Sequence, residues 1–341
     1  LNPDIILARA HIPLDDKRKE KIEFMCSLEK GDVISAPNVK NIYEVPVNFE
    51  NDALGDRILK KLKMAPKERD MKEWRSMVEK MNDAKKAVRI GIVGKYFGTG
   101  EFVLEDSYIS VIESIRHAGY AVNCRPEVVW LNSEQFEKNP ETLSDLDRFD
   151  GIIVPGGFGS RGIEGKIDVI KYCRENKIPY FGLCYGMQLA VTEFARHVAG
   201  MKGANTTEID QKTPYPVVDI MPEQKKNLKE KNFGATMRLG AYPALIRNGS
   251  LASVSYGVSE ISERHRHRYE VNPEYIKRLE KAGLVFSSAS PDGRLMEIAE
   301  LPQKVHPFFL GTQFHPELKS RPLNPHPLFV AFMKATVARK K

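Results

Sequence analysis

The stretch Tyr180-Phe-Gly-Leu-Cys-Tyr-Gly-Met-Gln-Leu189 predicts a short strand that turns sharply into a helix. An apolar run reaches Gly182 and helix-forming residues follow Gly186, so Cys184 lies at the turn. Glycines two residues before and after a nucleophile let neighbouring backbone approach a strained elbow, and the helix start that follows favours a thiolate. Its N–H groups can also hold a developing oxyanion. The alternative is a small core cysteine beside glycines that serve packing, and a base elsewhere in the chain would decide against it.

Such a base is supplied by the run Gly311-Thr-Gln-Phe-His-Pro-Glu317. If this run leaves a strand in extended form, His315 and Glu317 project on the same side, because residues two apart do so. Pro316 between them fixes φ and removes one competing N–H. The imidazole can take the thiol proton and the carboxylate can orient the imidazole. A histidine beside a proline is by itself more typical of a loop or a surface, and its joint occurrence with the cysteine elbow favours the catalytic interpretation.

The composition is that of an ordinary globular protein with room for two domains. The 341 residues are 42% hydrophobic and 28% charged. Lys and Arg number 52 against 45 Asp and Glu, which leaves a formal net charge of +7. This excess suits an anionic ligand such as a nucleotide, but it is small for the length. We therefore expect mostly solvated surface charge and no nucleic-acid partner.

Four cysteines are scattered without a CxxC pair, which argues against a zinc site and a disulfide framework. They are Cys26, Cys124, Cys173 and Cys184. We expect a reducing, cytoplasmic setting and no metal site. No apolar run approaches the roughly 18 residues that span a bilayer, so we expect no membrane partner. The chain opens at Leu1 on a strand-like run, which we interpret as part of a longer protein.

The order of predicted elements indicates an α/β fold in three regions. Residues 1–64 form a small α/β piece, and the charged residues 65–87 form a helical linker. Residues 88–341 alternate strands with helices, which predicts a mostly parallel sheet with helices on both faces and an active edge at the carboxyl ends of the strands. The expected strands are 4–10, 33–35, 42–45, 88–94, 150–155, 179–183, 260–272, 284–288, 295–299 and 308–314, with loops and short strands over 202–240. The expected helices are 17–27, 54–62, 106–117, 163–175, one from the elbow to 197, and 327–338.

Three motifs in this order resemble the class I glutamine amidotransferases, whose pattern is P-G-G, then G-x-C-x-G-x-Q, then H-P-E. They are Pro155-Gly-Gly157, Gly182 to Gln188, and His315 to Glu317. The run Glu263-Arg-His-Arg-His-Arg-Tyr-Glu-Val-Asn272 narrows the resemblance to the CTP synthase family. Supporting runs are Val93 to Tyr96, Asp106 to Val111, Pro155 to Gly162, Ala204 to Glu208 and Thr236 to Gly240. Residues 1–64 resemble the end of that family's Rossmann-like synthetase (amidoligase) domain, so we expect most of that domain to lie outside this chain.

The resemblance implies a catalytic triad for glutamine hydrolysis. Cys184 would attack the glutamine side-chain amide and form a glutamyl thioester, His315 would shuttle protons, and Glu317 would orient His315. The backbone N–H groups of Gly157 and Tyr185 would form the oxyanion hole. The family commonly has Leu where Tyr185 stands, and because the N–H is what the oxyanion needs, we expect activity to survive this change.

The resemblance also implies how glutamine is held. Gln188 would face the substrate, since it lies one helical turn beyond the nucleophile. Glu208 would receive the α-ammonium group and Arg268 the α-carboxylate. Charge complementarity favours this assignment independently, because glutamine is a zwitterion and Arg offers a planar fork to a carboxylate.

Four further residues are implied for nucleotides. Arg9 and Lys21 would lie near UTP or CTP, Val39 near the ATP adenine, and Arg161 would report the GTP effector. The complete enzyme would use ATP and Mg, respond to GTP and assemble as a homotetramer, whereas the glutaminase domain itself would bind no cofactor. Ammonia from glutamine would convert UTP to CTP in pyrimidine biosynthesis.

Other interpretations stay open at this point. The chain can be another class I amidotransferase or a γ-glutamyl hydrolase, and it can be a non-catalytic assembly module. The run Arg264-His-Arg-His-Arg268 can be a solvated basic strand or a nucleic-acid patch, although no aromatic stacking platform accompanies it.

Overall fold

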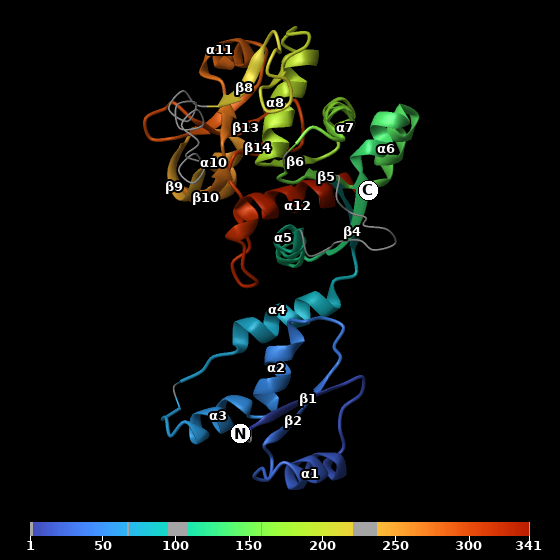
Figure 1. Cartoon of the computed structure of the whole chain (residues 1–341), viewed down its shortest axis with the longest axis vertical. Coiled ribbons are helices and arrows are strands. Elements are labelled where there is room, and N and C mark those ends of the chain that lie inside the picture. Colours follow the sequence, from blue (N-terminus) through green and yellow to red (C-terminus); the bar gives the residue numbers. More distant parts are fainter. Residues whose placement is uncertain (1–2, 67, 95–107, 158, 221–236, 341) are drawn as a thin grey trace. The chain divides into compact units, whose positions relative to one another are not determined.

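The computed structural model describes residues 3–66, 68–94, 108–157, 159–220 and 237–340 (Figure 1). The chain forms two compact units, Leu1–Asp83 and Ala84–Lys341. The predicted division into 1–64, 65–87 and 88–341 stays a prediction. The sequence runs discussed above that include 95–96, 106–107, 158 or 221–236 lie partly outside the described residues.

The first unit is an α/β piece with two parallel strands. β1 (Ile6–Ala10) pairs with β2 (Val33–Pro37), and α1 (Asp16–Met25) forms the crossover that parallel strands require. The helix begins after Asp15, because the Asp15 carboxylate accepts a hydrogen bond of 2.8 Å from the Arg18 N–H. The strands and the helix predicted here from the sequence are present.

The rest of the first unit is helical. The predicted strand 42–45 is wrong, because Pro46 lies in the first turn of the next helix, where its missing N–H costs nothing. The charged segment does form the predicted helix, and its Trp74 indole donates to the Tyr43 carbonyl at 2.9 Å. These helices are α2 (Glu44–Asn51), α3 (Leu54–Lys61) and α4 (Lys72–Asp83).

The second unit is built on one sheet that has nine strands within the described ranges. Their order is β10-β9-β12-β13-β14-β6-β5-β3-β4. The strands from β14 to β4 are parallel, and those from β13 to β10 extend the sheet with antiparallel pairs. The predicted α/β class with a parallel core is confirmed. The strands are β3 (Ala87–Gly94), β4 (Arg125–Asn132), β5 (Gly151–Val154), β6 (Tyr180–Leu183), β9 (Arg238–Ile246), β10 (Glu260–His267), β12 (Val285–Ala289), β13 (Met296–Glu300) and β14 (Phe309–Thr312).

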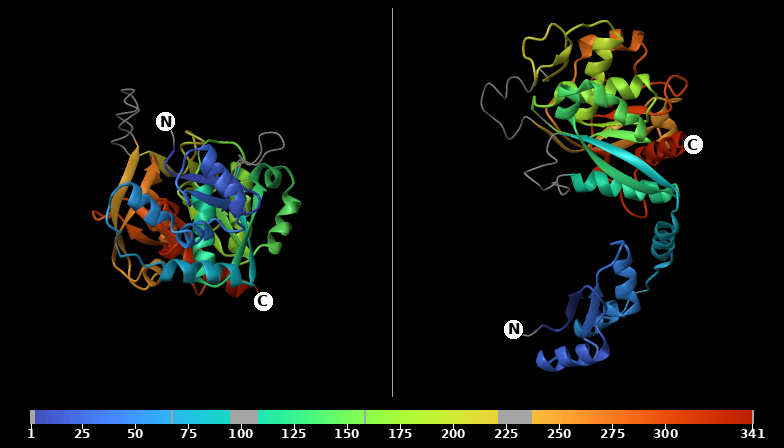
Figure 2. Two further views of the ribbon diagram at one scale, coloured as in Figure 1. Left: turned by 90° about the horizontal axis from the view of Figure 1, so that it is seen from below. Right: turned by 90° about the vertical axis from the view of Figure 1, so that its right-hand side faces the viewer.

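Helices cover both faces of this sheet (Figure 2). Consecutive residues of β6 point to opposite faces of the sheet and pack against different helices. Tyr180 packs with the core under α7 and α8, whereas the Phe181 ring lies 5.1 Å from Phe329 and 5.8 Å from Phe332 of α12. A parallel strand buried on both faces reads as a continuous apolar run, as this strand does. The longer helices are α5 (Ile109–Ala121), α7 (Ile163–Glu175), α8 (Tyr185–His197), α11 (Pro273–Lys281) and α12 (Pro327–Arg339), and the shorter ones are α6 (Ser133–Lys138) and α10 (Leu251–Tyr256).

Several features of the second unit differ from the prediction. Strand β9 and helices α6, α10 and α11 were not among the expected elements. The edge strand β4 was not expected, because its Pro126 and its partly exposed residues hide the strand pattern. The single strand predicted over 260–272 is instead two strands that break at Arg268. The second of them, β11 (Tyr269–Val271), joins a separate small sheet with β8 (Pro216–Ile220) and β7 (Asn205–Thr206). No helix among the described residues is long and apolar enough to cross a membrane.

Candidate active site

Cys184 lies on a strained turn between strand β6 and helix α8. Its φ is +49° and its ψ is −97°, a conformation that costs a non-glycine residue about 1–3 kcal/mol. Adjacent strands hold it there, since the Cys184 N–H donates to the Thr312 carbonyl at 2.6 Å. The predicted strand, elbow and helix are all present.

The glycines beside the nucleophile have the spatial role expected from the sequence. A Cβ on Gly182 would lie 2.7 Å from the carbonyl carbon of Gly186. A Cβ on Gly186 would overlap the carbonyl oxygen of Val154 in β5. The elbow therefore depends on both glycines for the close approach of strand and helix backbone.

His315 and Glu317 lie together just after β14. The imidazole Nδ1 lies 2.7 Å from the Glu317 Oε1. The expected extended run is wrong, because Pro316–Leu318 forms a short 3-10 helix. This turn brings the two side chains together, and the His315 N–H donates to the Arg264 carbonyl of β10 at 2.8 Å.

The imidazole also faces the cysteine. Burial alone would lower the pKa of His315, but Cys184 and Glu317 more than offset this and raise it to about 10. A Cβ on Gly156 would lie 2.9 Å from His315 Cε1 and 3.8 Å from Cys184 Cβ, so all three residues meet at one point. Nε2 of His315 is buried and makes no hydrogen bond within the part of the chain that the structure describes. The arrangement suits proton exchange between the imidazole and the cysteine.

A cavity of about 660 Å³ opens at Cys184. It is large enough for an amino-acid substrate. Residues predicted for the triad and for glutamine contact all line it; their roles stay predictions. They are Gly157, Cys184, Tyr185, Gln188, Glu208, Arg268, His315 and Glu317.

Tyr185 and Glu208 both hold the loop that follows Gly157. The Tyr185 hydroxyl donates to the Gly159 carbonyl at 3.1 Å, and Glu208 Oε1 accepts from the Gly159 N–H at 3.0 Å. The larger ring at position 185 therefore has a partner of its own. We expect it to steady the loop rather than to block the cavity.

Arg268 directly follows β10, a strand whose side chains alternate strictly between buried and exposed. The side chains of Glu263, His265 and His267 are buried, whereas Arg264 and Arg266 between them are exposed. The strand ends before Arg268, which lines the cavity. The interpretation of a solvated basic strand therefore applies only to the face that carries Arg264 and Arg266, since the other face of this strand is core.

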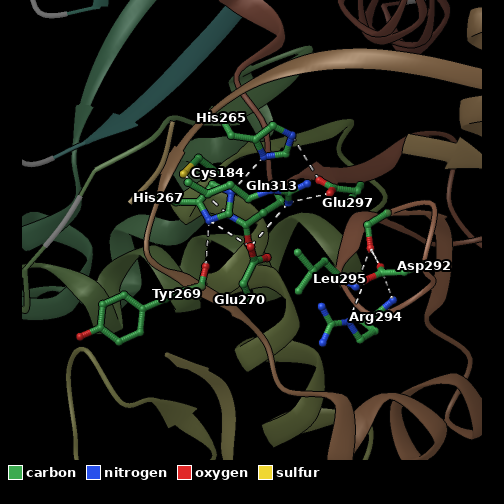
Figure 3. A network of polar contacts seen from close by, with 12 residues as sticks. Cys184, His265, His267, Tyr269, Glu270, Asp292, Arg294, Leu295, Glu297 and Gln313 are labelled. Atoms are coloured by element: carbon green, nitrogen blue, oxygen red, sulfur yellow. Dashed lines mark hydrogen bonds and ion pairs between the residues drawn. The ribbon is translucent and has the colours of Figure 1, made fainter. Parts of the chain in front are cut away.

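Gln313 is a residue of the site to which the sequence analysis assigned no role. Its Nε2 lies 3.7 Å from the Cys184 sulfur, and its Oε1 accepts from Gln188 Nε2 at 3.2 Å (Figure 3). Its position just before the H-P-E motif was the available signal.

The residues predicted for nucleotides lie elsewhere. Arg161 pairs with Glu134 at 2.6 Å and is not among the cavity residues. In the first unit, the exposed Arg9 guanidinium donates to Asn38 Oδ1 at 2.8 Å, Lys21 is exposed on α1, and Val39 is partly buried. Arg9 and Val39 lie at the carboxyl ends of two parallel strands, where α/β folds bind ligands.

Comparisons with known proteins identify relatives of this chain. Residues 103–335 match the family model for class-I glutamine amidotransferases, and residues 1–64 match that for the CTP synthase N-terminus. The chain is 48% identical to a CTP synthase of Methanocaldococcus jannaschii and 50% identical to one of Carboxydothermus hydrogenoformans, in each case over 100% of the chain and 62% of the relative. The chain thus spans 62% of the length of these curated relatives.

A solved structure is similar as well. The glutaminase domain of Trypanosoma brucei CTPS with bound acivicin matches with a TM-score of 0.67 and 38% identity, covering 74% of this chain and 95% of that one. The chain therefore belongs to the CTP synthase family, with a class I glutamine amidotransferase domain in its larger unit.

Proposed function

We propose that this chain hydrolyses L-glutamine through a thioester on Cys184. The observation that carries the proposal is the meeting of Cys184, His315 and Glu317 at one cavity in a chain with the amidotransferase pattern. The Cys184 sulfur attacks the side-chain carbonyl carbon, the C–N bond breaks, and His315 gives its proton to the departing nitrogen. Ammonia leaves. Water then attacks the thioester while His315 takes its proton. The C–S bond breaks, His315 returns the proton to the sulfur, and glutamate departs with the thiol restored.

The oxyanion that forms during both attacks is held by backbone donors. We assign this role to the N–H groups of Gly157 and Tyr185. A donor of this kind is typically worth about 2.7–4 kcal/mol of transition-state stabilisation. The hydrogen bonds of Gly159 with Tyr185 and Glu208 support the assignment, because they steady the loop that carries Gly157.

Glutamine is oriented by groups at the cavity wall. Glu208 takes the α-ammonium group and Arg268 the α-carboxylate, and both side chains line the cavity. The Gln188 nitrogen is engaged by the Tyr269 carbonyl at 2.9 Å, so the Gln188 oxygen is the atom left to receive the substrate amide.

We further propose that the ammonia serves the ATP-dependent amination of UTP to CTP. The match of residues 1–64 to the CTP synthase N-terminus supports this over another class I amidotransferase or a γ-glutamyl hydrolase. In the complete enzyme, ATP, Mg and UTP act in the synthetase domain, with Arg9, Lys21 and Val39 near the nucleotides. GTP is the effector, with Arg161 as its reporter.

We also propose that the whole protein is a cytoplasmic homotetramer. The four free cysteines, Cys26, Cys124, Cys173 and Cys184, suit a reducing compartment. An assembly role without catalysis is less well supported, because the triad residues are intact and share a cavity.

The proposal is tested by glutamate release from glutamine, with and without GTP. We expect the wild-type chain to release glutamate, GTP to accelerate the release, and Cys184→Ala to abolish it. A response to GTP separates a CTP synthase from other amidotransferases. Release that continues at the same rate in Cys184→Ala contradicts the proposal.

A further inference from the structure

A line of buried polar groups runs from the Cys184 sulfur into the core of the second unit (Figure 3). Gln313 Nε2 approaches the sulfur at 3.7 Å, and Gln313 Oε1 accepts from Gln188 Nε2 at 3.2 Å. Gln188 Nε2 also donates to the Tyr269 carbonyl at 2.9 Å. Gln313 is fully buried and Gln188 nearly so. Water therefore cannot easily replace the hydrogen bonds that these two amides make with each other.

The direction of this line is set at the Tyr269 carbonyl, because a carbonyl oxygen can only accept. The Gln188 atom that faces it must therefore be the nitrogen. That nitrogen then needs an acceptor on its other side, which is the Gln313 oxygen. The Gln313 nitrogen is left to point at the Cys184 sulfur.

A buried histidine, His267, contacts the same carbonyl, and a second, His265, contacts His267. His267 Nδ1 lies 3.2 Å from the Tyr269 oxygen, so it carries the proton, and its Nε2 accepts from His265 Nδ1 at 2.9 Å. Burial lowers the pKa of His265 to about 2 and that of His267 to about 3, so both are neutral at physiological pH. Neutral imidazoles in these tautomers form a one-directional chain of donors that ends at Tyr269.

Ionisable side chains lie at the end of this hydrogen-bonded line that is farther from Cys184. His265 Nε2 faces Glu297 at 3.5 Å, and Arg238 pairs with Glu297 at 2.7 Å and with Glu270 at 3.6 Å. Burial raises the pKa of Glu297 to about 7 and that of Glu270 to about 8. His265 Nε2 and the Glu297 carboxylate oxygens are buried and make no hydrogen bond among the described residues, so the His265–Glu297 approach is a contact and not a hydrogen bond.

We propose that Gln313 donates a hydrogen bond to the Cys184 thiolate, and that His267 is a positioning residue that holds the Tyr269 carbonyl on which the orientation of Gln188 and Gln313 depends. A hydrogen bond to the charged form favours that form, most of all where the thiolate is buried. The titratable groups packed around the line are His315, Arg238, Glu270 and Glu297, and four further charged groups line the cavity at the sulfur: Glu208, Arg266, Arg268 and Glu317. The N–H that faces the sulfur from the core side is that of Gln313. The inference rests on the proposed role of Cys184 as nucleophile and adds a second donor to it.

The test is the rate of Cys184 alkylation by iodoacetamide as a function of pH, measured on the whole chain in the absence of glutamine. Mass spectrometry of the Cys184 peptide separates this reaction from that of the other cysteines. Gln313→Met keeps the size of the side chain but removes the donor, and we expect the midpoint of the rate profile to rise by about one pH unit or more. The matched control, Gln135→Met on the exposed face of α6, should leave the midpoint unchanged.

A pair of variants at position 267 tests the positioning role. His267→Asn keeps an N–H donor for the Tyr269 carbonyl, and we expect a midpoint near that of the wild type. His267→Leu removes the donor and should raise the midpoint, as Gln313→Met does. An equal shift in both variants would overturn the role of His267.

An unchanged midpoint in folded Gln313→Met overturns the proposed donor. Far-UV circular dichroism checks folding, and if Gln313→Met does not fold, the comparison of His267→Asn with His267→Leu decides alone. Alkylation needs no turnover, so its outcome is distinct from that of the glutaminase assay. If the wild-type chain hydrolyses glutamine but Gln313→Met leaves the midpoint of the alkylation profile unchanged, this inference is refuted and the proposed function stands.

Discussion

Replacing His315 with Gln lowers kcat for glutamine hydrolysis by about 10²–10⁴-fold, the usual contribution of a positioned acid–base group. The reason is that, in the mechanism proposed above, His315 protonates the departing amide nitrogen and takes the proton of the attacking water. KM should change far less, because the groups proposed to bind the α-ammonium and α-carboxylate of glutamine are untouched. Steady-state kinetics of glutamate release separates the two parameters.

The matched control for this prediction is His197→Gln. His197 lies at the end of α8, partly exposed and paired with Glu193 at 3.2 Å, and it does not line the cavity. Its replacement should leave kcat within about two-fold of the wild type. Equal losses of kcat in the two variants would contradict the assignment of His315.

His315→Gln should also change how the free energy of unfolding depends on pH. The pKa of His315 is raised from 6.5 to about 10 in the folded chain. The folded state therefore holds this proton more tightly than the unfolded state. The resulting stabilisation is complete below about pH 6.5 and is lost as the pH rises through about 10. His315→Gln lacks this term, so over that pH window its free energy of unfolding should fall less steeply than that of the wild type.

Replacing Gly186 with Ala should destabilise the second unit by about 1–3 kcal/mol or more, as expected for overpacking. The new methyl group would overlap the Val154 carbonyl oxygen of the neighbouring strand, so the backbone itself must shift to admit it. Glutaminase activity should be lost together with stability, because Cys184 depends on this turn. Urea unfolding followed by Trp130 fluorescence, in a Trp74→Phe background, reports on the second unit.

Gly157→Ala is the matched control for this substitution. A Cβ at Gly157 would meet its nearest neighbours, Lys166 and Tyr185, at an ordinary 3.9 Å. We expect its unfolding free energy to stay within about 0.5 kcal/mol of the wild type. Equal stability of Gly186→Ala and Gly157→Ala would show that the elbow tolerates a side chain, and the account of its geometry would be wrong.

The elbow could be predicted from the sequence because its determinants are local. Strand, Gly182, Cys184, Gly186 and helix follow one another directly, and each residue acts on its immediate neighbours. The pairing of His315 with Glu317 was likewise predictable from their spacing, although the backbone between them is a 3-10 turn and not an extended strand. Proline at the start of such a turn permits either geometry, so the pattern alone could not distinguish them.

The role of Gln313 was not predictable in the same way. Its partner Gln188 is 125 residues away in the sequence, and the two meet because β14 lies beside β6 in the sheet. The break of β10 at Arg268 depends on a second sheet. The sequence pattern of residues 260–272 does not by itself predict that sheet. The prediction of a strand over 42–45 was wrong for the opposite reason. It followed the local apolar pattern and gave too little weight to Pro46, which is typical of a helix start. Long-range strand order and the caps of short helices are what the single sequence left undetermined.

The most direct test of the central claim is covalent labelling of the whole chain with a diazo ketone analogue of glutamine, followed by mass spectrometry. The account predicts one adduct, located on the peptide that contains Cys184, suppressed by excess glutamine and absent from Cys184→Ala. An adduct on another residue, or labelling that is undiminished in Cys184→Ala, would contradict the claim that Cys184 is the nucleophile.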